Sequence, residues 1–181
     1  MLLLRVSDLA GTHAVAAAIA GVSRAGDVIV LSGEMGAGKT AFAQGFGRAL
    51  GVTEPITSPT FTLVHSYPLD NRLTLHHADI YRLERTGDVE DLALYELAAF
   101  RGIVLIEWGD VAAATLGDHL EVRLEHVDDD DDDESGDGAD DATGADEFAD
   151  PGTREIELRA VGIGWAGRWD RLARALEPYR C

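Results

Sequence analysis

The residues with the clearest chemical potential form one glycine-rich segment, Gly33-Glu34-Met35-Gly36-Ala37-Gly38-Lys39-Thr40. Its spacing, G-x-x-x-x-G-K-T, is that of a phosphate-binding loop. Glycines let the backbone turn tightly, so that successive N–H groups can approach a phosphate chain without a Cβ in the way. Lys39 can reach the β- and γ-phosphates, and the hydroxyl of Thr40 can bind Mg2+. The segment therefore predicts binding of a nucleotide together with Mg2+.

The sequence on either side of this loop supplies the elements that would hold it. An apolar run at 28–31 precedes the loop, and residues 41–50 have helical character and end at Gly51, as helices often do. A helix that begins at such a loop directs its N-terminal N–H groups at the bound anion. The residues that we expect to contact the nucleotide phosphates are Gly33, Glu34, Met35, Gly36, Ala37, Gly38, Lys39, Thr40 and Ala41.

Two acidic residues at the ends of apolar runs are the next candidates. Residues 73–79 alternate as a half-buried strand and end in Asp79, where α/β proteins place active groups. Residues 103–106 form a continuous apolar run, typical of a parallel strand buried on both faces, and Glu107 and Trp108 follow. Because Mg2+ on Thr40 needs further oxygen ligands, Glu107 is the expected second ligand.

A hydroxyl-rich segment at 57–64, which contains Ser58 and Thr60, allows two interpretations. It is either an edge strand with surface threonines or a switch loop that senses the γ-phosphate and its Mg2+. The neighbouring pair His76 and His77 also suggests a metal site, but adjacent residues on a strand face opposite ways. We therefore expect packing or hydrogen-bonding roles for these two histidines.

Length and composition favour one globular domain over the 181 residues. The single cysteine, Cys181, excludes a disulfide framework, and a reducing cytoplasmic compartment is the expected location. The apolar N-terminus, 1–6, is too short for a signal peptide, and no run approaches the length of a membrane span.

The net charge of −18 arises mainly from one segment. Between Asp128 and Thr153 there are thirteen acidic residues and no Lys or Arg, which leaves −5 for the rest of the chain (−18 + 13). Such a composition predicts a solvated, disordered insertion over 128–153, with a basic partner or divalent cations as alternative roles. An anionic chain of this kind is a poor candidate for gripping nucleic acid through its own surface.

The remaining pattern predicts an α/β fold of the three-layer P-loop type, with a mostly parallel central sheet and an antiparallel C-terminal edge. Helices are expected over 7–20, beginning at Ser7 or Asp8, and over 88–100 and 165–176. Two alternating segments, 119–126 and 153–161, predict a pair of antiparallel strands. In the last of these helices, three arginines are spaced by three residues and are therefore expected on one exposed face, namely Arg168, Arg171 and Arg174.

Four segments resemble a known family in their order and spacing. They are Gly-Glu-Met-Gly-Ala-Gly-Lys-Thr at 33–40, Ser-Pro-Thr-Phe-Thr-Leu-Val at 58–64, His-Ala-Asp-Ile-Tyr-Arg-Leu at 77–83 and Ile-Glu-Trp at 106–108. The chain resembles the bacterial TsaE (YjeE) family, small P-loop ATPases needed to make threonylcarbamoyladenosine in tRNA. The resemblance implies binding of ATP and Mg2+, slow ATP hydrolysis, and association with the TsaD and TsaB proteins, which carry out the carbamoyl transfer.

The same resemblance implies roles for individual residues. Lys39 and the loop amides would hold the phosphates, and Asp79 would be the acid important for hydrolysis, which makes it our candidate for orienting the attacking water. Thr12 matches a position near the adenine. Thr60 lies in the switch, and Trp108 is the aromatic residue that follows the metal-binding glutamate in this family.

Alternative functions remain open at this stage. A small-molecule kinase would need a lid bearing several arginines, whereas the arginines here are scattered. A nucleotide-switched binding module, in which hydrolysis is incidental, overlaps with the family function. A GTPase is disfavoured, because the single asparagine, Asn71, lies outside an Asn-Lys-x-Asp motif. No obvious arginine finger is built into the sequence, in which Arg82 is one candidate, so we expect slow, partner-dependent hydrolysis.

Overall fold

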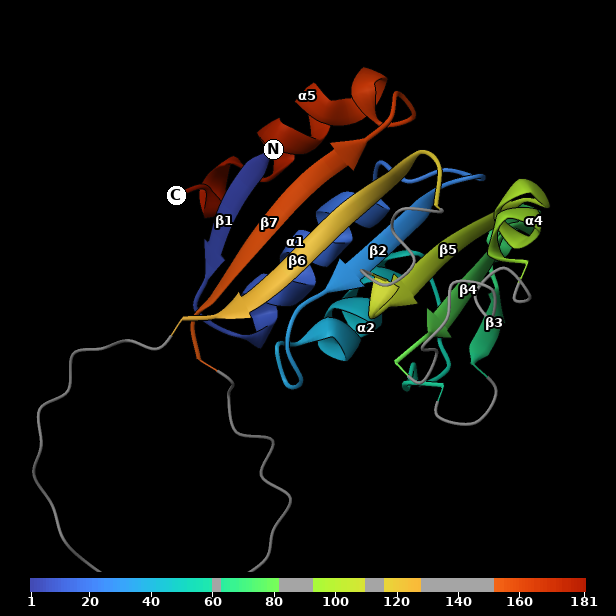
Figure 1. The fold of residues 1–181 in the computed structure, drawn as a ribbon, viewed down its shortest axis with the longest axis horizontal. Coiled ribbons are helices and arrows are strands. Elements are labelled where there is room, and N and C mark those ends of the chain that lie inside the picture. The colour runs from blue at the N-terminus through green and yellow to red at the C-terminus, as the bar shows by residue number, and fades with distance from the viewer. Residues whose placement is uncertain (60–62, 82–92, 110–115, 128–151) are drawn as a thin grey trace, which may run out of the picture.

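The chain folds around one seven-stranded sheet with strand order β1-β7-β6-β2-β5-β4-β3 (Figure 1). This computed structural model describes residues 1–59, 63–81, 93–109, 116–127 and 152–181. The strands are β1 (Leu2–Val6), β2 (Val28–Ser32), β3 (Val64–Pro68), β4 (Thr74–Asp79), β5 (Gly102–Glu107), β6 (His119–His126) and β7 (Arg154–Val161). The helices are α1 (Leu9–Ala20), α2 (Lys39–Ala49), α4 (Leu94–Ala99) and α5 (Ala166–Ala175), with short 3-10 turns η1 (Asp70–Arg72) and η3 (Glu177–Tyr179).

The centre of the sheet is parallel and its flanks are antiparallel. Strands β6, β2, β5 and β4 run in one direction, while β7 pairs antiparallel with both β6 and β1, and β3 pairs antiparallel with β4. The predicted fold class is therefore confirmed, including the antiparallel β6–β7 pair. Because the parallel strands end at the same edge, the residues that follow β2, β4 and β5 are brought together there.

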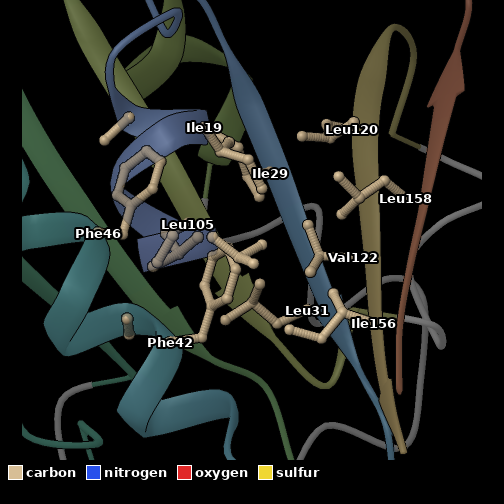
Figure 2. Packing of buried hydrophobic residues seen from close by; sticks show 14 of the residues in the cluster. Ile19, Ile29, Leu31, Phe42, Phe46, Leu105, Leu120, Val122, Ile156 and Leu158 are labelled. Carbon is tan, nitrogen blue, oxygen red and sulfur yellow. The ribbon is translucent and has the colours of Figure 1, made fainter. Parts of the chain in front are cut away.

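The main core lies between one face of the sheet and the helices α1, α2 and α5. Figure 2 shows Phe42 and Phe46 of α2 directed at the sheet, close to Leu105 of β5 and Leu31 of β2. The alternation of β6 and β7 sends their inward residues, such as Val122 and Ile156, into the same core. This shared core holds α2 against the central strands β2 and β5.

The opposite face carries a smaller apolar cluster over β2, β5 and β4. Leu94 and Ala98 of α4 cover it, together with Leu116. Strands β6 and β7 instead present charged residues on this side, for example Arg159, which forms an ion pair with Glu121. Helices therefore flank both faces of the central strands, as the three-layer prediction requires.

Local boundaries agree with the sequence signals in most places. Asp8 is the N-cap of α1, and its side chain accepts a hydrogen bond from the N–H of Gly11 at 2.7 Å. The strand expected within 57–64 begins only at Val64, so Ser58 lies in a loop rather than in an edge strand. The helix expected over 88–100 is described over Leu94–Ala99.

One sequence prediction is wrong, because Arg168 does not belong to an exposed face of α5. Its guanidinium turns inward, forms an ion pair with Asp27 in which Nη2 is 2.6 Å from Oδ1, and lies 4.1 Å from the ring centroid of Trp165. Arg171 and Arg174 are exposed as expected. Helical spacing places the three residues on one stripe, but the stripe alone does not show that Arg168, near the start of α5, packs against Asp27.

Several predictions lie outside the described residues and stay predictions. They concern Thr60 of the switch segment, the arginine-finger candidate Arg82, and nearly all of the acidic insertion over 128–153. Within the described part of the chain, every helix is too short or too polar to cross a membrane.

Candidate functional site

The glycine-rich loop connects β2 to α2 at the edge where the parallel strands end (Figure 1). Gly33 and Gly38 adopt φ values of 135° and 100°, a region that favours glycine. At Gly33 a Cβ would lie 2.2 Å from the carbonyl oxygen of Leu124, so only glycine fits there. Gly38 is the N-cap of α2, which places the positive end of that helix at the loop.

The loop has an exposed tip and a buried base. Glu34, Met35 and Gly36 are exposed, whereas Ala37 is buried and Ala41 is half-buried in the first turn of α2. The base is therefore packed into the protein while the tip faces solvent, where a phosphate chain could reach it.

Lys39 occupies the inside of the loop. Its side chain is nearly buried, and its Nζ donates hydrogen bonds to the carbonyl oxygens of Gly33 at 2.9 Å and of Glu34 at 2.7 Å. The same ammonium lies 3.6 Å from the ring centroid of Trp108, close enough for a cation–π interaction. Trp108 in turn contacts the ring of Tyr81, with centroids 4.8 Å apart. Trp108 thus packs against the lysine that we expect to bind the phosphates.

A chain of hydrogen bonds joins the loop to the ends of β4 and β5. The hydroxyl of Thr40 donates to Oε2 of Glu107 at 3.1 Å, and Nε2 of His77 donates to the other oxygen, Oε1, at 2.9 Å. Both His77 and Glu107 are buried. Glu107 is therefore held from two sides, so that its carboxylate is presented to the hydroxyl that we expect to bind Mg2+.

Asp79 lies beside Glu107, because the two residues are register partners in the β4–β5 pair. One of its carboxylate oxygens accepts a hydrogen bond from the backbone N–H of Tyr81 at 3.0 Å, and the other accepts one from the hydroxyl of Ser58. The structure thus joins Ser58, the described member of the expected switch, to the acid expected to act in hydrolysis.

The donors at this site fit the groups that the sequence implies. A hydroxyl and carboxylates are the hard oxygen ligands that Mg2+ prefers. The backbone N–H groups at the start of α2, together with the Lys39 ammonium, are suited to phosphate oxygens. Thr40 and Glu107 could therefore hold Mg2+ beside a phosphate chain in the loop.

The two adjacent histidines have separate roles on opposite faces of β4. His76 pairs with Ser66 across the β3–β4 ladder, with 2.8 Å between Nδ1 and Oγ, and burial lowers its pKa. His77 orients Glu107. Thr12 is also fully buried, and its hydroxyl donates to the carbonyl of Asp8 at 3.3 Å within α1. A role for Thr12 near the adenine stays a prediction.

Replacing His77 with alanine is expected to weaken Mg2+ binding about 10- to 100-fold, the usual effect of losing a group that orients a metal ligand. The reason is that Glu107 would lose one of its two hydrogen-bond donors and its fixed orientation. Calorimetric titration of ADP at increasing Mg2+ concentration measures this effect. His76→Gln is the matched control, since His76 lies on the other face; equal Mg2+ dependence in both variants would contradict the role of His77.

Two residues at this site were missed by the sequence reasoning. Arg154, at the start of β7, is buried, and its Nε donates to the carbonyl oxygen of Ala37 at 2.9 Å. His126, at the end of β6, places Nε2 2.9 Å from the carbonyl oxygen of Gly36. A signal was available for Arg154, because the alternation of β7 puts it on the same face as the buried Ile156 and Leu158.

Comparison with known proteins gives matches over most of the chain. The family model described as "Threonylcarbamoyl adenosine biosynthesis protein TsaE" matches residues 6–135. The chain is similar to the tRNA threonylcarbamoyladenosine biosynthesis protein TsaE of Bacillus subtilis, with 39% identity over 120 residues, covering 66% of this chain and 74% of that protein. It is also 40% identical over 151 residues to the protein of the same name from Streptomyces coelicolor, covering 82% and 89% respectively.

A solved structure shares the fold. The crystal structure of YdiB from Bacillus subtilis matches with a TM-score of 0.67 and 28% sequence identity, over 96% of this chain and 94% of that chain. The sequence relatives, the family model and the motifs therefore point to one family.

Proposed function

This chain belongs to the TsaE family, whose role is in tRNA threonylcarbamoyladenosine biosynthesis, and we propose that it acts there as a Mg2+-dependent ATP-binding protein and slow ATPase. Its target would be a complex of the TsaD and TsaB proteins, in support of N6-threonylcarbamoyladenosine formation. The observation that carries the proposal is the hydrogen bond between Thr40 of the loop and Glu107 of β5, with Asp79 beside it in register. This arrangement supports hydrolysis better than it supports simple phosphate binding.

Each of these residues has a physical role in the proposed reaction. The N–H groups of the loop and the Lys39 ammonium would stabilise the negative charge on the transferring phosphoryl group. Thr40 and Glu107 would hold Mg2+, which when bound neutralises charge on the phosphate oxygens. The carboxylate of Asp79 would accept a hydrogen bond from the attacking water, while Ser58 keeps that carboxylate oriented.

The isolated protein is expected to turn over ATP slowly. The sequence has no obvious built-in arginine finger besides the candidate Arg82, so a partner is expected to complete the stabilisation of charge or to gate the site. Direct capture of tRNA by this protein is not expected, because a net charge of −18 opposes binding to a polyanion. The tRNA would be handled by the complex on which the protein acts.

A pull-down with the organism's own TsaD and TsaB tests this function. The protein is expected to capture the complex in the presence of ATP and Mg2+ and to capture less of it without nucleotide. Thr40→Val is the informative variant, since it keeps the shape of the side chain and removes the hydroxyl that bonds Glu107. Ser66→Ala, on an edge strand, is its control.

Failure of the folded wild-type protein to bind the complex in every nucleotide state would contradict the proposed target. In that case, a screen for acceptor-dependent ADP release would test the alternative of a small-molecule kinase. Nucleotide-dependent capture that is retained by Ser66→Ala and lost by Thr40→Val would support the proposal.

A further inference from the structure

We propose that Arg154 is a positioning residue of the phosphate site, which fixes the Ala37–Gly38 peptide of the loop and places a permanent positive charge behind it. The proposal rests on the proposed nucleotide binding and adds a residue from a distant part of the chain. Arg154 lies outside the glycine-rich motif, 117 residues away from Ala37 in sequence. It is the first residue of β7.

The contact between Arg154 and the loop is close and buried. The side chain is 1% exposed, and its Nε donates to the carbonyl oxygen of Ala37 at 2.9 Å. At Gly38 a Cβ would lie 2.9 Å from Nε and 3.3 Å from Cζ of Arg154. The guanidinium therefore rests directly against the Cα of Gly38, and this close approach is a second reason, besides the φ of 100°, for glycine at that position.

The hydrogen bond sets the direction of an N–H group that a phosphate would need. In a planar trans peptide the N–H points away from the C=O of the same unit. Because Arg154 holds the carbonyl of Ala37 on the β7 side, the N–H of Gly38 is turned to the opposite side of that peptide. Gly38 is the N-cap of α2, so its N–H belongs to the group of helix-terminal donors expected to face an anion.

Neighbouring residues of β6 support the same part of the loop. The carbonyl oxygen of Leu124 lies only 2.2 Å from the position that a Cβ of Gly33 would occupy, and Nε2 of His126 lies 2.9 Å from the carbonyl oxygen of Gly36. His126 and Arg154 are themselves register partners in the β6–β7 pair. The loop is thus held by a rigid antiparallel pair on one side, and Arg154 contributes the buried, charged contact.

The chemistry of arginine suits this position. Its guanidinium stays protonated at all physiological pH values, and its planar, rigid arrangement of donors can hold a carbonyl while the rest of the group packs on a glycine. A cation next to the loop has the sign that attracts phosphate groups. Lysine in its place would keep the charge but would lose the Nε donor.

The test compares nucleotide affinities of Arg154→Lys and Arg154→Gln with those of the wild type, measured by calorimetric titration of ADP with Mg2+ and of adenosine. Arg154→Gln is expected to weaken ADP binding about tenfold or more, in line with the loss of a charge-assisted hydrogen bond. The ADP affinity of Arg154→Lys should lie between those of the wild type and Arg154→Gln. The affinity for adenosine should not change in either variant. Arg159→Gln is the matched control, since it removes an exposed arginine from the same strand.

Hydrogen–deuterium exchange of the nucleotide-free proteins supplies a second readout. Faster exchange in the segment 33–40 of Arg154→Lys, with unchanged exchange in α5, is expected if Arg154 orders the loop. This measurement keeps the test decisive if Arg154→Gln does not fold.

The outcomes separate the two proposals. Equal ADP affinity in the wild type and in the folded Arg154 variants, together with unchanged loop exchange, would overturn the role of Arg154 alone. Absence of ADP binding by the wild type would overturn the proposed function instead. Equal losses of ADP and adenosine affinity would show a general structural role and would also overturn the inference.

Discussion

Lys39→Ala protein is expected to bind ATP–Mg2+ about 10- to 100-fold more weakly than the wild type, the effect of losing a charge-assisted hydrogen bond. The reason lies in the position of the ammonium inside the loop, bonded to the carbonyls of Gly33 and Glu34 and close to the ring of Trp108. Truncation removes the charge that would meet the phosphates and also the group that draws these carbonyls inward. Calorimetric titration with ATP and Mg2+ measures the loss.

Arg48→Ala is the matched control for this experiment. It removes the same unit of positive charge from the exposed last turn of the same helix, α2. If both variants lost affinity equally, the effect would be one of net charge, and the specific position of Lys39 would not matter. Thermal melting of the two proteins checks that each variant remains folded.

Asp79→Asn is expected to lower the rate of ATP hydrolysis about 100- to 1,000-fold, within the usual range for loss of a group that acts on the attacking water. ATP affinity should be nearly unchanged, because the described contacts of Asp79 are with Ser58 and the N–H of Tyr81 and not with the loop. Phosphate release gives the rate, and titration with ATP gives the affinity. Asp70→Asn, an exposed acid in η1, is the control.

The same variant separates turnover from occupancy. In a reconstituted reaction with TsaD and TsaB, Asp79→Asn protein loaded with ATP should fail to support repeated modification of tRNA if hydrolysis is required. Full support by a variant that no longer hydrolyses ATP would favour a nucleotide-switched binding module. A hydrolysis rate equal to that of the wild type would show that Asp79 has no role in the chemical step.

Local sequence patterns predicted much of the fold, because the order of apolar and polar residues reflects which side chains are buried. The continuous apolar run before Glu107 corresponds to β5, which is buried on both faces, and the alternation at 119–126 corresponds to β6. The glycine-rich motif located the loop between β2 and α2, since its backbone conformations and its spacing belong to one local unit. Boundaries were less accurate where polar residues flank a strand, as at Val64.

The sequence by itself determined the parts of this protein that depend on residues close together in the chain: the glycine-rich loop, the strands that end in Asp79 and Glu107, and the α/β class. Only the tertiary structure decided which distant residues meet. Strand order places His77 within hydrogen-bond distance of Glu107 and Arg154 within hydrogen-bond distance of the Ala37 carbonyl. The packing of α5 directs Arg168 toward Asp27. The physical reason is that a periodic pattern specifies the face on which a side chain lies, whereas its partner is set by strand register and helix tilt, which depend on the packing of the whole core.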